Sequence, residues 1–193
     1  MKIIDLIEDQ RGDQVCNTIF AELKAVSSSD EIFSNKLKGP IYEENPGIAR
    51  FILCYLAERG MTLENNVDLW LQDGKQYRWT IEHIFPQGQN IPQPWVDMIA
   101  GGDQATALSH QKEYVHQLGN LTITAYNSSL SNKSFQDKRD RIDRNGNFVG
   151  FKNRLNLNTQ LASTESWTIE QIQARTHDLL QKVLLEFNIH NTL

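Results

Sequence analysis

Cysteine is scarce in this sequence, and the few cysteines are not spaced for a metal site. The 193 residues include two, Cys16 and Cys54, and no Cys-x-x-Cys pair, which argues against a structural zinc site. Both lie among apolar residues at helical spacing, so we expect them to be buried free thiols. Such cysteine use is typical of a reducing compartment, and we expect a cytoplasmic protein.

Long hydrophobic runs are also missing. The apolar run near the N-terminus, residues 3–7, is interrupted by Asp5 and is too short for a signal peptide. No segment approaches the roughly 18–20 apolar residues that span a membrane. Hydrophobic residues make up 39% and charged residues 22%, as in globular proteins, and we expect one domain over residues 1–193.

Positive charge is low overall but concentrated in one tract. The net charge of −5 argues against a nucleic-acid partner, yet residues 133–154 carry seven basic side chains against three aspartates, a local charge of +4. A basic tract on an acidic body is a natural place for phosphate contacts. For a charge run alone, the plainer interpretation is a solvated helix face with Asp–Arg pairs. The candidate contacts to DNA are Lys133, Lys138, Arg139 and Arg141.

Helical periodicity dominates both ends of the chain. Apolar spacing predicts helices over 13–26, 30–39 and 46–60, which together form a helical scaffold over residues 1–60. The longest predicted helix begins near Thr168, because Thr168 and Gln171 form a capping box, and C-terminal helices are expected over 153–193. The third helix is expected to bury Ile48, Phe51, Ile52, Tyr55 and Leu56, and all of this predicts a mostly helical α+β domain.

Two short stretches carry the residues with chemistry. Residues 79–87 read Trp-Thr-Ile-Glu-His-Ile-Phe-Pro-Gln and place Glu82 and His83 at the end of a strand predicted over 77–81. Residues 118–127 form a second short strand, and a polar run and a basic helix are predicted to follow it. The intervening residues 88–117 contain loop signals and a helix predicted over 103–117, and we expect them to form an insertion that covers the site.

The insertion also contains two histidines, His110 and His116. They are six residues apart, which places them on different faces of the predicted helix. That arrangement is wrong for joint metal binding, and we expect each to be an ordinary surface or interfacial histidine.

The residue types in the two strands suit phosphodiester hydrolysis. That reaction requires a base for water, an electrophile on the phosphate oxygens and help for the leaving oxygen. A neutral imidazole serves as the base near pH 7, and a hard divalent cation with oxygen ligands serves the other needs. His83 would be the base, Glu82 and Asn127 would supply oxygens, and Asn120 would pin the loop that carries His83. Taken singly, Gly-Asn is usually a turn and Asn127 a helix cap.

Taken in order, these residues resemble a known family. Ile81 to Gln87, Leu118 to Thr122, and Tyr126 to Ser128 followed by 130–135 and Lys138 are similar to the signature of the C-terminal domain of GmrSD-type restriction endonucleases. That family belongs to the HNH, or His-Me finger, nucleases. The similarity covers roughly residues 40–187, and several motifs in the right order are far more specific than any one alone.

The resemblance implies a fold and a set of roles. The fold would be a small ββα-metal unit over 76–144, with the insertion 88–117, enclosed in a helical domain. His83 would be the general base and Asn120 the structural asparagine that orients its loop. Glu82 and Asn127 would hold one divalent metal ion, Mg²⁺ or Mn²⁺.

The resemblance also implies a metal-dependent DNA endonuclease that restricts phage or modified DNA. In such proteins this domain usually follows a ParB-like, nucleotide-hydrolysing domain, which would then be a partner alongside DNA. The sequence contains no P-loop-like Gly-Lys-Ser/Thr, and we expect an excised or stand-alone nuclease domain.

Three features depart from the wider HNH pattern. Glu82 stands where Asp is commoner, Asn127 stands where His is a frequent ligand, and the spacing from His83 to Asn120 is long. Two alternatives stay open. One is a catalytically inactive DNA-binding or partner-docking module on the same fold. The other is a helical interaction domain without nucleic acid, which a basic tract far from His83 would favour.

Overall fold

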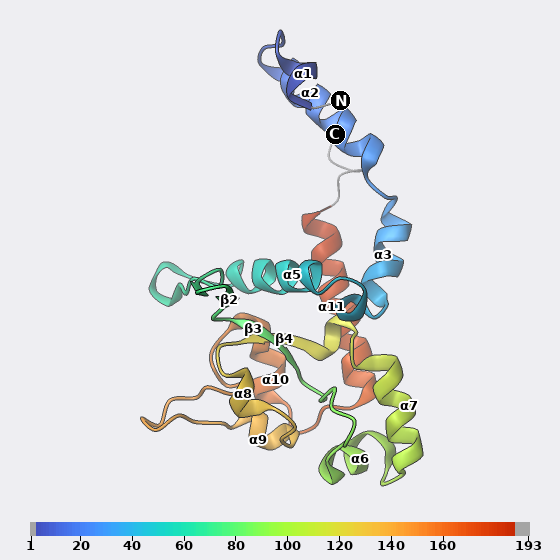
Figure 1. Ribbon diagram of the computed structural model, residues 1–193, viewed down its shortest axis with the longest axis vertical. Helices are drawn as coiled ribbons and strands as arrows, with labels where there is room; N and C mark the ends of the chain where they lie inside the picture. The colour runs from blue at the N-terminus through green and yellow to red at the C-terminus, as the bar shows by residue number, and fades with distance from the viewer. Residues whose placement is uncertain (1–2, 188–193) are drawn as a thin grey trace.

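The computed structural model describes residues 3–187 and shows a mostly helical body from which one pair of helices extends (Figure 1). Within these residues four short strands form two separate antiparallel sheets. The predicted α+β class is therefore confirmed. None of the helices within 3–187 combines the length and apolar character needed to cross a membrane.

The N-terminal third is helical, with boundaries close to those predicted. Ser29 caps α3 by accepting a bond from the Ile32 N–H, and Asn45 caps α5 from the Ile48 N–H with Pro46 in the first turn. The helices are α1 (Ile3–Ile7), α2 (Asp13–Val26), α3 (Asp30–Lys38), α4 (Ile41–Glu44) and α5 (Pro46–Glu58), followed by the 3₁₀ turn η1 (Leu63–Asn65).

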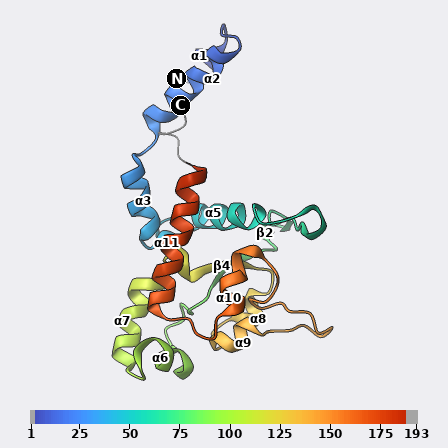
Figure 2. The same cartoon turned by 180° about the vertical axis from the view of Figure 1, so that it is seen from behind.

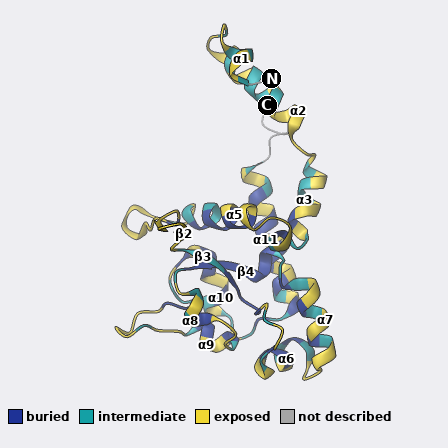
Figure 3. Cartoon of the chain, in the orientation of Figure 1, coloured by how far each residue is buried: buried dark blue, intermediate teal, exposed yellow. Residues whose placement is uncertain are grey.

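The helices α1 and α2 stand apart from the body and bury no residue (Figure 3). Cys16 on α2 is exposed, so the expectation that it is buried is wrong. Its helix has the predicted apolar spacing, but within residues 3–187 the short helix α1 is the element that packs most against it, and no residue of α2 becomes buried. Cys54 on α5 is buried as predicted, and burial raises the pKa of its thiol to about 11, which leaves the thiol protonated and unreactive.

The buried face of α5 matches the predicted one only in part, since Ile52 is buried as predicted. Ile48 and Phe51 are about half exposed, whereas Ala49, Leu53 and Ala57 are fully buried. These three residues recur every four positions and face β4 and α11. Small alanines permit a close approach there, while the prediction followed the bulkiest side chains.

Two antiparallel pairs of strands make up the sheets. The strands β1 (Gln72–Asp73) and β2 (Gln76–Tyr77) flank a turn in which Gly74 has a positive φ of 67°, as the Asp-Gly signal predicts. The strands β3 (Thr80–His83) and β4 (Leu121–Thr124) pair with His83 opposite Leu121. The predicted strand 77–81 is thus two strands, and both Glu82 and His83 lie within the second one.

The remaining helices surround β3 and β4. The segment 88–117 contributes α6 (Gln93–Ala100) and α7 (Gln104–Tyr114), so α7 ends before His116. After β4 the predicted basic helix is only the short α9, because the chain leaves the helix at Asp140 and forms a hairpin. The other elements are η2 (Leu118–Asn120), α8 (Asn127–Leu130), α9 (Phe135–Arg139), η3 (Asn156–Asn158), α10 (Thr159–Ser163) and α11 (Ile169–Glu186).

The long C-terminal helix α11 holds the turn before β4. Its predicted capping box at Thr168 is present. The buried Arg175 guanidinium donates to the carbonyls of Gly119 and Leu121 at 2.7 Å each. A Cβ at Gly119 would lie 2.1 Å from the Ile172 carbonyl oxygen, so this approach requires glycine. Figure 2, the view from behind, shows α11 running past the end of α5 and beside the turn before β4.

Two hydrophobic clusters meet at this small sheet. One lies among α3, α5, β4 and α11 and includes Leu121 and Ile123. The other lies among α6, α9 and the start of α11 and includes Ile84, Phe85 and Trp95. The end of β3 is therefore packed from both sides, which fixes the residues that carry the candidate chemistry.

Candidate active site

A cavity of about 210 Å³ opens at the end of β3. Glu82 and His83 reach it from β3, Asn127 from the start of α8, and Lys138 from α9. The structure thus brings the predicted carboxylate, imidazole and amide to one cavity, although they lie up to 45 positions apart in the chain. Its other lining residues are Tyr42, Ile81, Pro86, Gln87, Ser131 and Asn132.

Asn120 lies behind the cavity and is completely buried. Its Oδ1 accepts a hydrogen bond from the Phe85 N–H at 2.8 Å, and its Nδ2 donates to the Phe85 carbonyl at 2.9 Å. Nδ2 also donates to the Val115 carbonyl at 2.9 Å. One side chain thereby holds the loop just after His83 and ties it to the end of the 88–117 segment.

Asn127 is oriented by the strand beside it. Its Nδ2 donates to the Ile81 carbonyl at 2.6 Å and to the Thr80 hydroxyl at 3.2 Å. A carbonyl only accepts, so the atom facing Ile81 must be the nitrogen of the amide. With the nitrogen engaged by β3, the side-chain oxygen Oδ1 is the atom that Asn127 can offer to a ligand.

A buried ion pair joins Glu82 to Lys138. The Lys138 ammonium lies 2.6 Å from Glu82 Oε1 and also donates to the carbonyls of His83 at 2.7 Å and Ile84 at 3.1 Å. These three acceptors match its three N–H donors. Burial raises the pKa of the Glu82 carboxyl and lowers that of the Lys138 amine, and their mutual attraction opposes both shifts.

The four candidate DNA contacts fall into two groups, one buried and one exposed. Lys138 is fully buried, and Arg139 is buried and bonded to Asp140, Glu165 and the Thr164 carbonyl, so neither faces a duplex. The short helix α9 turns both toward the interior beside Phe135. Lys133 and Arg141 are exposed and stay available.

His116 is the residue that sequence reasoning missed. Its Nδ1 lies 3.2 Å from Nε2 of His83, and the ring of Tyr42 stacks on His116 and meets His83 edge-on. The expectation of an ordinary surface or interfacial histidine does not fit this contact. His110 instead contacts the ring of Tyr114. His116 lies four residues before Asn120, but this spacing indicates a contact with His83 only once the end of α7 and the loop after it are known.

Both rings of the histidine pair are shifted toward the neutral form. Burial, with smaller contributions from the nearby His116 and Lys138, lowers the pKa of His83 to about 3. Burial also lowers the pKa of His116, which Glu43 partly opposes. When both imidazoles are neutral, one ring donates its N–H to the other, and only the donor ring keeps a free lone pair on its second nitrogen.

The oxygen donors of the cavity fit a hard divalent cation. Across residues 3–187, no cluster of three or more His, Cys, Asp or Glu side chains gathers to hold a metal ion. Glu82 and the Oδ1 of Asn127 offer two oxygen ligands, and Mg²⁺ in enzymes is often held by one or two such side chains, water and substrate phosphate. The residues present therefore fit a weakly held, substrate-assisted ion.

The fold and the cavity define a small α+β domain with a polar site lined by the strand β3, the short helices α4, α8 and α9, and the loops beside them. A family model for the C-terminal domain of GmrSD restriction endonucleases matches residues 27–182. The chain belongs to this family, and the resemblance read from the motifs is confirmed. Neither the curated proteins nor the solved structures provide a match.

Proposed function

We propose that this domain is a metal-dependent DNA endonuclease of the HNH type that acts in restriction. The observation that carries the proposal is the convergence of Glu82, His83 and Asn127 on one cavity, in a chain of a restriction endonuclease family. The strands β3 and β4 with the helices that follow would form the ββα unit. DNA is the substrate that this family implies, and phage or modified DNA would be the target.

His83 is the general base of the proposed reaction. Its Nε2 lies 3.2 Å from Nδ1 of His116. This role requires the tautomer in which Nε2–H donates to His116, because the lone pair of Nδ1 is then free to accept a proton from water. The water oxygen then bonds to phosphorus while the P–O3′ bond breaks, and the proton moves to Nδ1. The phosphate anion favours the imidazolium that forms, offsetting the cost of burial.

The other residues bind and orient. Glu82 and Asn127 would hold the divalent cation, which supplies charge stabilisation to the phosphate and the leaving oxygen when bound. Lys138 fixes the Glu82 carboxylate and the carbonyl of His83 itself, so the base and the ligand move together. Asn120 keeps the loop after His83 in place from behind.

A plasmid-nicking assay tests this function. The wild-type domain is incubated with supercoiled DNA in Mg²⁺, in Mn²⁺ and in EDTA, beside His83→Ala. We expect cleavage with either metal, none with EDTA, and none by His83→Ala although that variant still binds DNA. Near-normal cutting by His83→Ala would refute the assignment of the base, and cutting in EDTA would refute the metal.

A further inference from the structure

The hairpin of residues 140–150 extends from α9 into solvent (Figure 1). Ile142 and Phe148 pair across it and are 50% and 48% exposed. Paired cross-strand residues point to the same face, so these two large apolar side chains form one exposed patch. The turn between them is closed by Asp143, whose carboxylate accepts from the N–H groups of Asn145 and Asn147.

The same hairpin carries two arginines that form no ion pair in the described part of the chain, although Asp140 and Asp143 balance their formal charge. Arg141 and Arg144 are exposed, and within residues 3–187 neither guanidinium has a hydrogen-bond or ion-pair partner. The nearest acid in sequence, Asp143, keeps its negative charge, but its oxygens accept N–H bonds inside the turn and pair with neither guanidinium. An apolar patch flanked by unpaired arginines is suited to a long partner that has repeated negative charges and exposes apolar groups between them.

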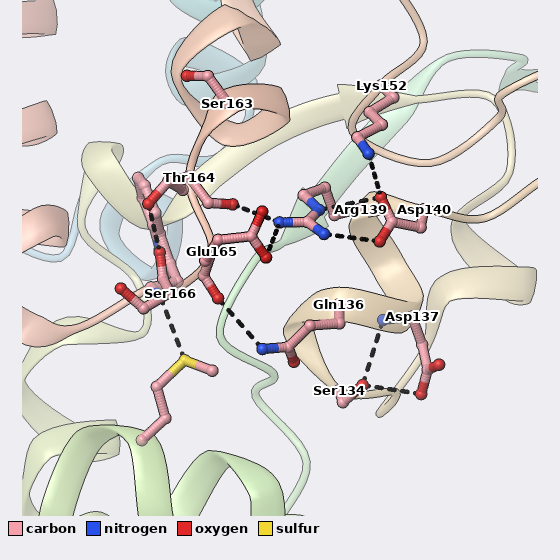
Figure 4. A network of polar contacts seen from close by, with 12 residues as sticks. Ser134, Gln136, Asp137, Arg139, Asp140, Lys152, Ser163, Thr164, Glu165 and Ser166 are labelled. Carbon is pink, nitrogen blue, oxygen red and sulfur yellow. Dashed lines mark hydrogen bonds and ion pairs between the residues drawn. The ribbon is translucent and has the colours of Figure 1, made fainter.

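The base of the hairpin is fixed to the cavity wall. The N–H of Phe151 donates to the carbonyl of Lys138 at 3.1 Å, and Lys138 is the residue that holds Glu82. Asp140 binds Arg139 and Lys152 on either side of the hairpin, at 2.7 Å each (Figure 4). The direction of the hairpin is therefore set relative to the site.

We propose that this hairpin enters the major groove of duplex DNA beside the phosphate to be cut. Arg141 and Arg144 contact backbone phosphates, and Ile142 and Phe148 contact the methyl groups of thymine. The proposal rests on the proposed nuclease function. The roughly 12 Å major groove of B-DNA admits a two-stranded β-ribbon, whereas the minor groove is only roughly 6 Å wide. The thymine methyl is the apolar group on the major-groove base edges.

The phosphate contacts are tested by the salt dependence of binding. In the non-cleaving His83→Ala background, affinity for a labelled duplex is measured over a salt series. Each lost phosphate contact lowers the log–log slope by about 0.9, so Arg141→Gln with Arg144→Gln should lower it by about two. The control pair, Lys36→Gln with Lys182→Gln, removes the same charge from exposed sites elsewhere and should leave the slope unchanged. An unchanged slope in the arginine variant overturns these contacts.

The apolar contact is tested by replacing thymine with deoxyuridine, which removes only the methyl groups. Each methyl lost from contact should weaken binding about fourfold. Ile142→Ser with Phe148→Ser should bind both duplexes equally weakly and keep the wild-type salt slope. Both residues are exposed, so the variant should stay folded, which its thermal unfolding checks. A wild-type protein indifferent to the methyl groups overturns the contact.

The outcome also separates this proposal from the nuclease assignment. Equal binding of an RNA duplex overturns major-groove entry, because the major groove of RNA is too deep and narrow for side chains. If the wild type cuts plasmid while both hairpin variants bind as the wild type does, the hairpin proposal fails and the nuclease function stands. If the wild type never cuts, the nuclease function fails, and the binding results still decide the hairpin.

Discussion

His83 Nε2 lies 3.2 Å from Nδ1 of His116, and the ring of Tyr42 contacts both imidazoles. The backbone N–H of Tyr42 also donates to the carbonyl of His116, so α4 fixes the second histidine in place. Because a ring nitrogen of one imidazole faces a ring nitrogen of the other, one proton lies between them when they form a hydrogen bond as neutral rings. The contact engages Nε2 of His83, so Nδ1 is the ring nitrogen that remains for the proposed chemistry.

The first prediction tests whether residue 116 acts through its hydrogen bond to His83 or only by filling space. An asparagine side chain places its amide close to where Nδ1 of histidine lies, whereas a glutamine amide reaches further, to the position of Nε2. His116→Asn should therefore keep the bond to His83 and most of the cleavage rate. His116→Gln and His116→Ala should cut about 10- to 100-fold more slowly, as is typical when a group that orients an active-site histidine is lost.

The measurement is the single-turnover cleavage rate at saturating metal ion. His177→Asn is the control, because His177 is exposed on α11 and does not line the cavity. Thermal unfolding of each variant separates misfolding from misorientation. Equal rates for the asparagine and glutamine variants would show that the hydrogen bond to His83 has no part in orienting the base.

The residues that meet at this site were easier to predict from the sequence than the contacts around them. The association of Glu82 and His83 with the distant asparagines could be predicted, because the order of the motifs along the chain is itself specific to a family. The histidine pair was not, because it depends on α7 ending at Tyr114 and on a loop that returns to the site. Helical periodicity continues through such an ending and gives no sign of it.

The fold shows the same division. Helices with clear caps, such as those that begin after Ser29 and Asn45, were predicted almost to the residue. The role of Lys138 was not, because a lysine in a basic tract reads as a surface residue. Its burial depends on three acceptors that only tertiary structure assembles: one carboxylate and two carbonyls.

The second prediction concerns the buried pair of Lys138 and Glu82. Lys138→Met removes the cation and leaves the carboxylate and two carbonyls without their donor. Breaking one partner of a buried pair typically costs about 3–5 kcal/mol of folding free energy. Adding Glu82→Gln to Lys138→Met removes the stranded charge and should recover part of that loss.

Urea denaturation of the single and double variants provides the measurement. Cleavage should stay absent in the double variant, because Glu82 is the proposed metal ligand. Lys36→Met serves as the control, since Lys36 makes an exposed pair with Glu44 and should lose less than about 1 kcal/mol. A double variant less stable than Lys138→Met would contradict the account of a stranded carboxylate.

The third prediction concerns the oxygen of Asn127. Asn127→Ala removes the proposed ligand Oδ1, so the Mg²⁺ concentration for half-maximal cleavage should rise about tenfold or more, with a smaller effect on DNA affinity measured in EDTA. The matched control is Asn132→Ala, which lies on the same cavity wall. Overlapping Mg²⁺ titrations for the wild type and Asn127→Ala would remove this residue from the ligand set.

The fourth prediction concerns acid stability at the base of the hairpin. Hydrogen bonds from Arg139 and Lys152 lower the pKa of Asp140 from 3.8 to about 2. Because the folded-state pKa is depressed, Asp140 stabilises the fold above its unfolded pKa, and this contribution is lost as the pH falls from about 4 to 2. Asp140→Asn should therefore lower the urea midpoint at pH 7 but leave it nearly unchanged at pH 2. The carboxylate is partly exposed, so the loss at pH 7 should be modest and should shrink in high salt. A deficit that persists undiminished at pH 2 would mean that Asp140 acts through shape rather than charge.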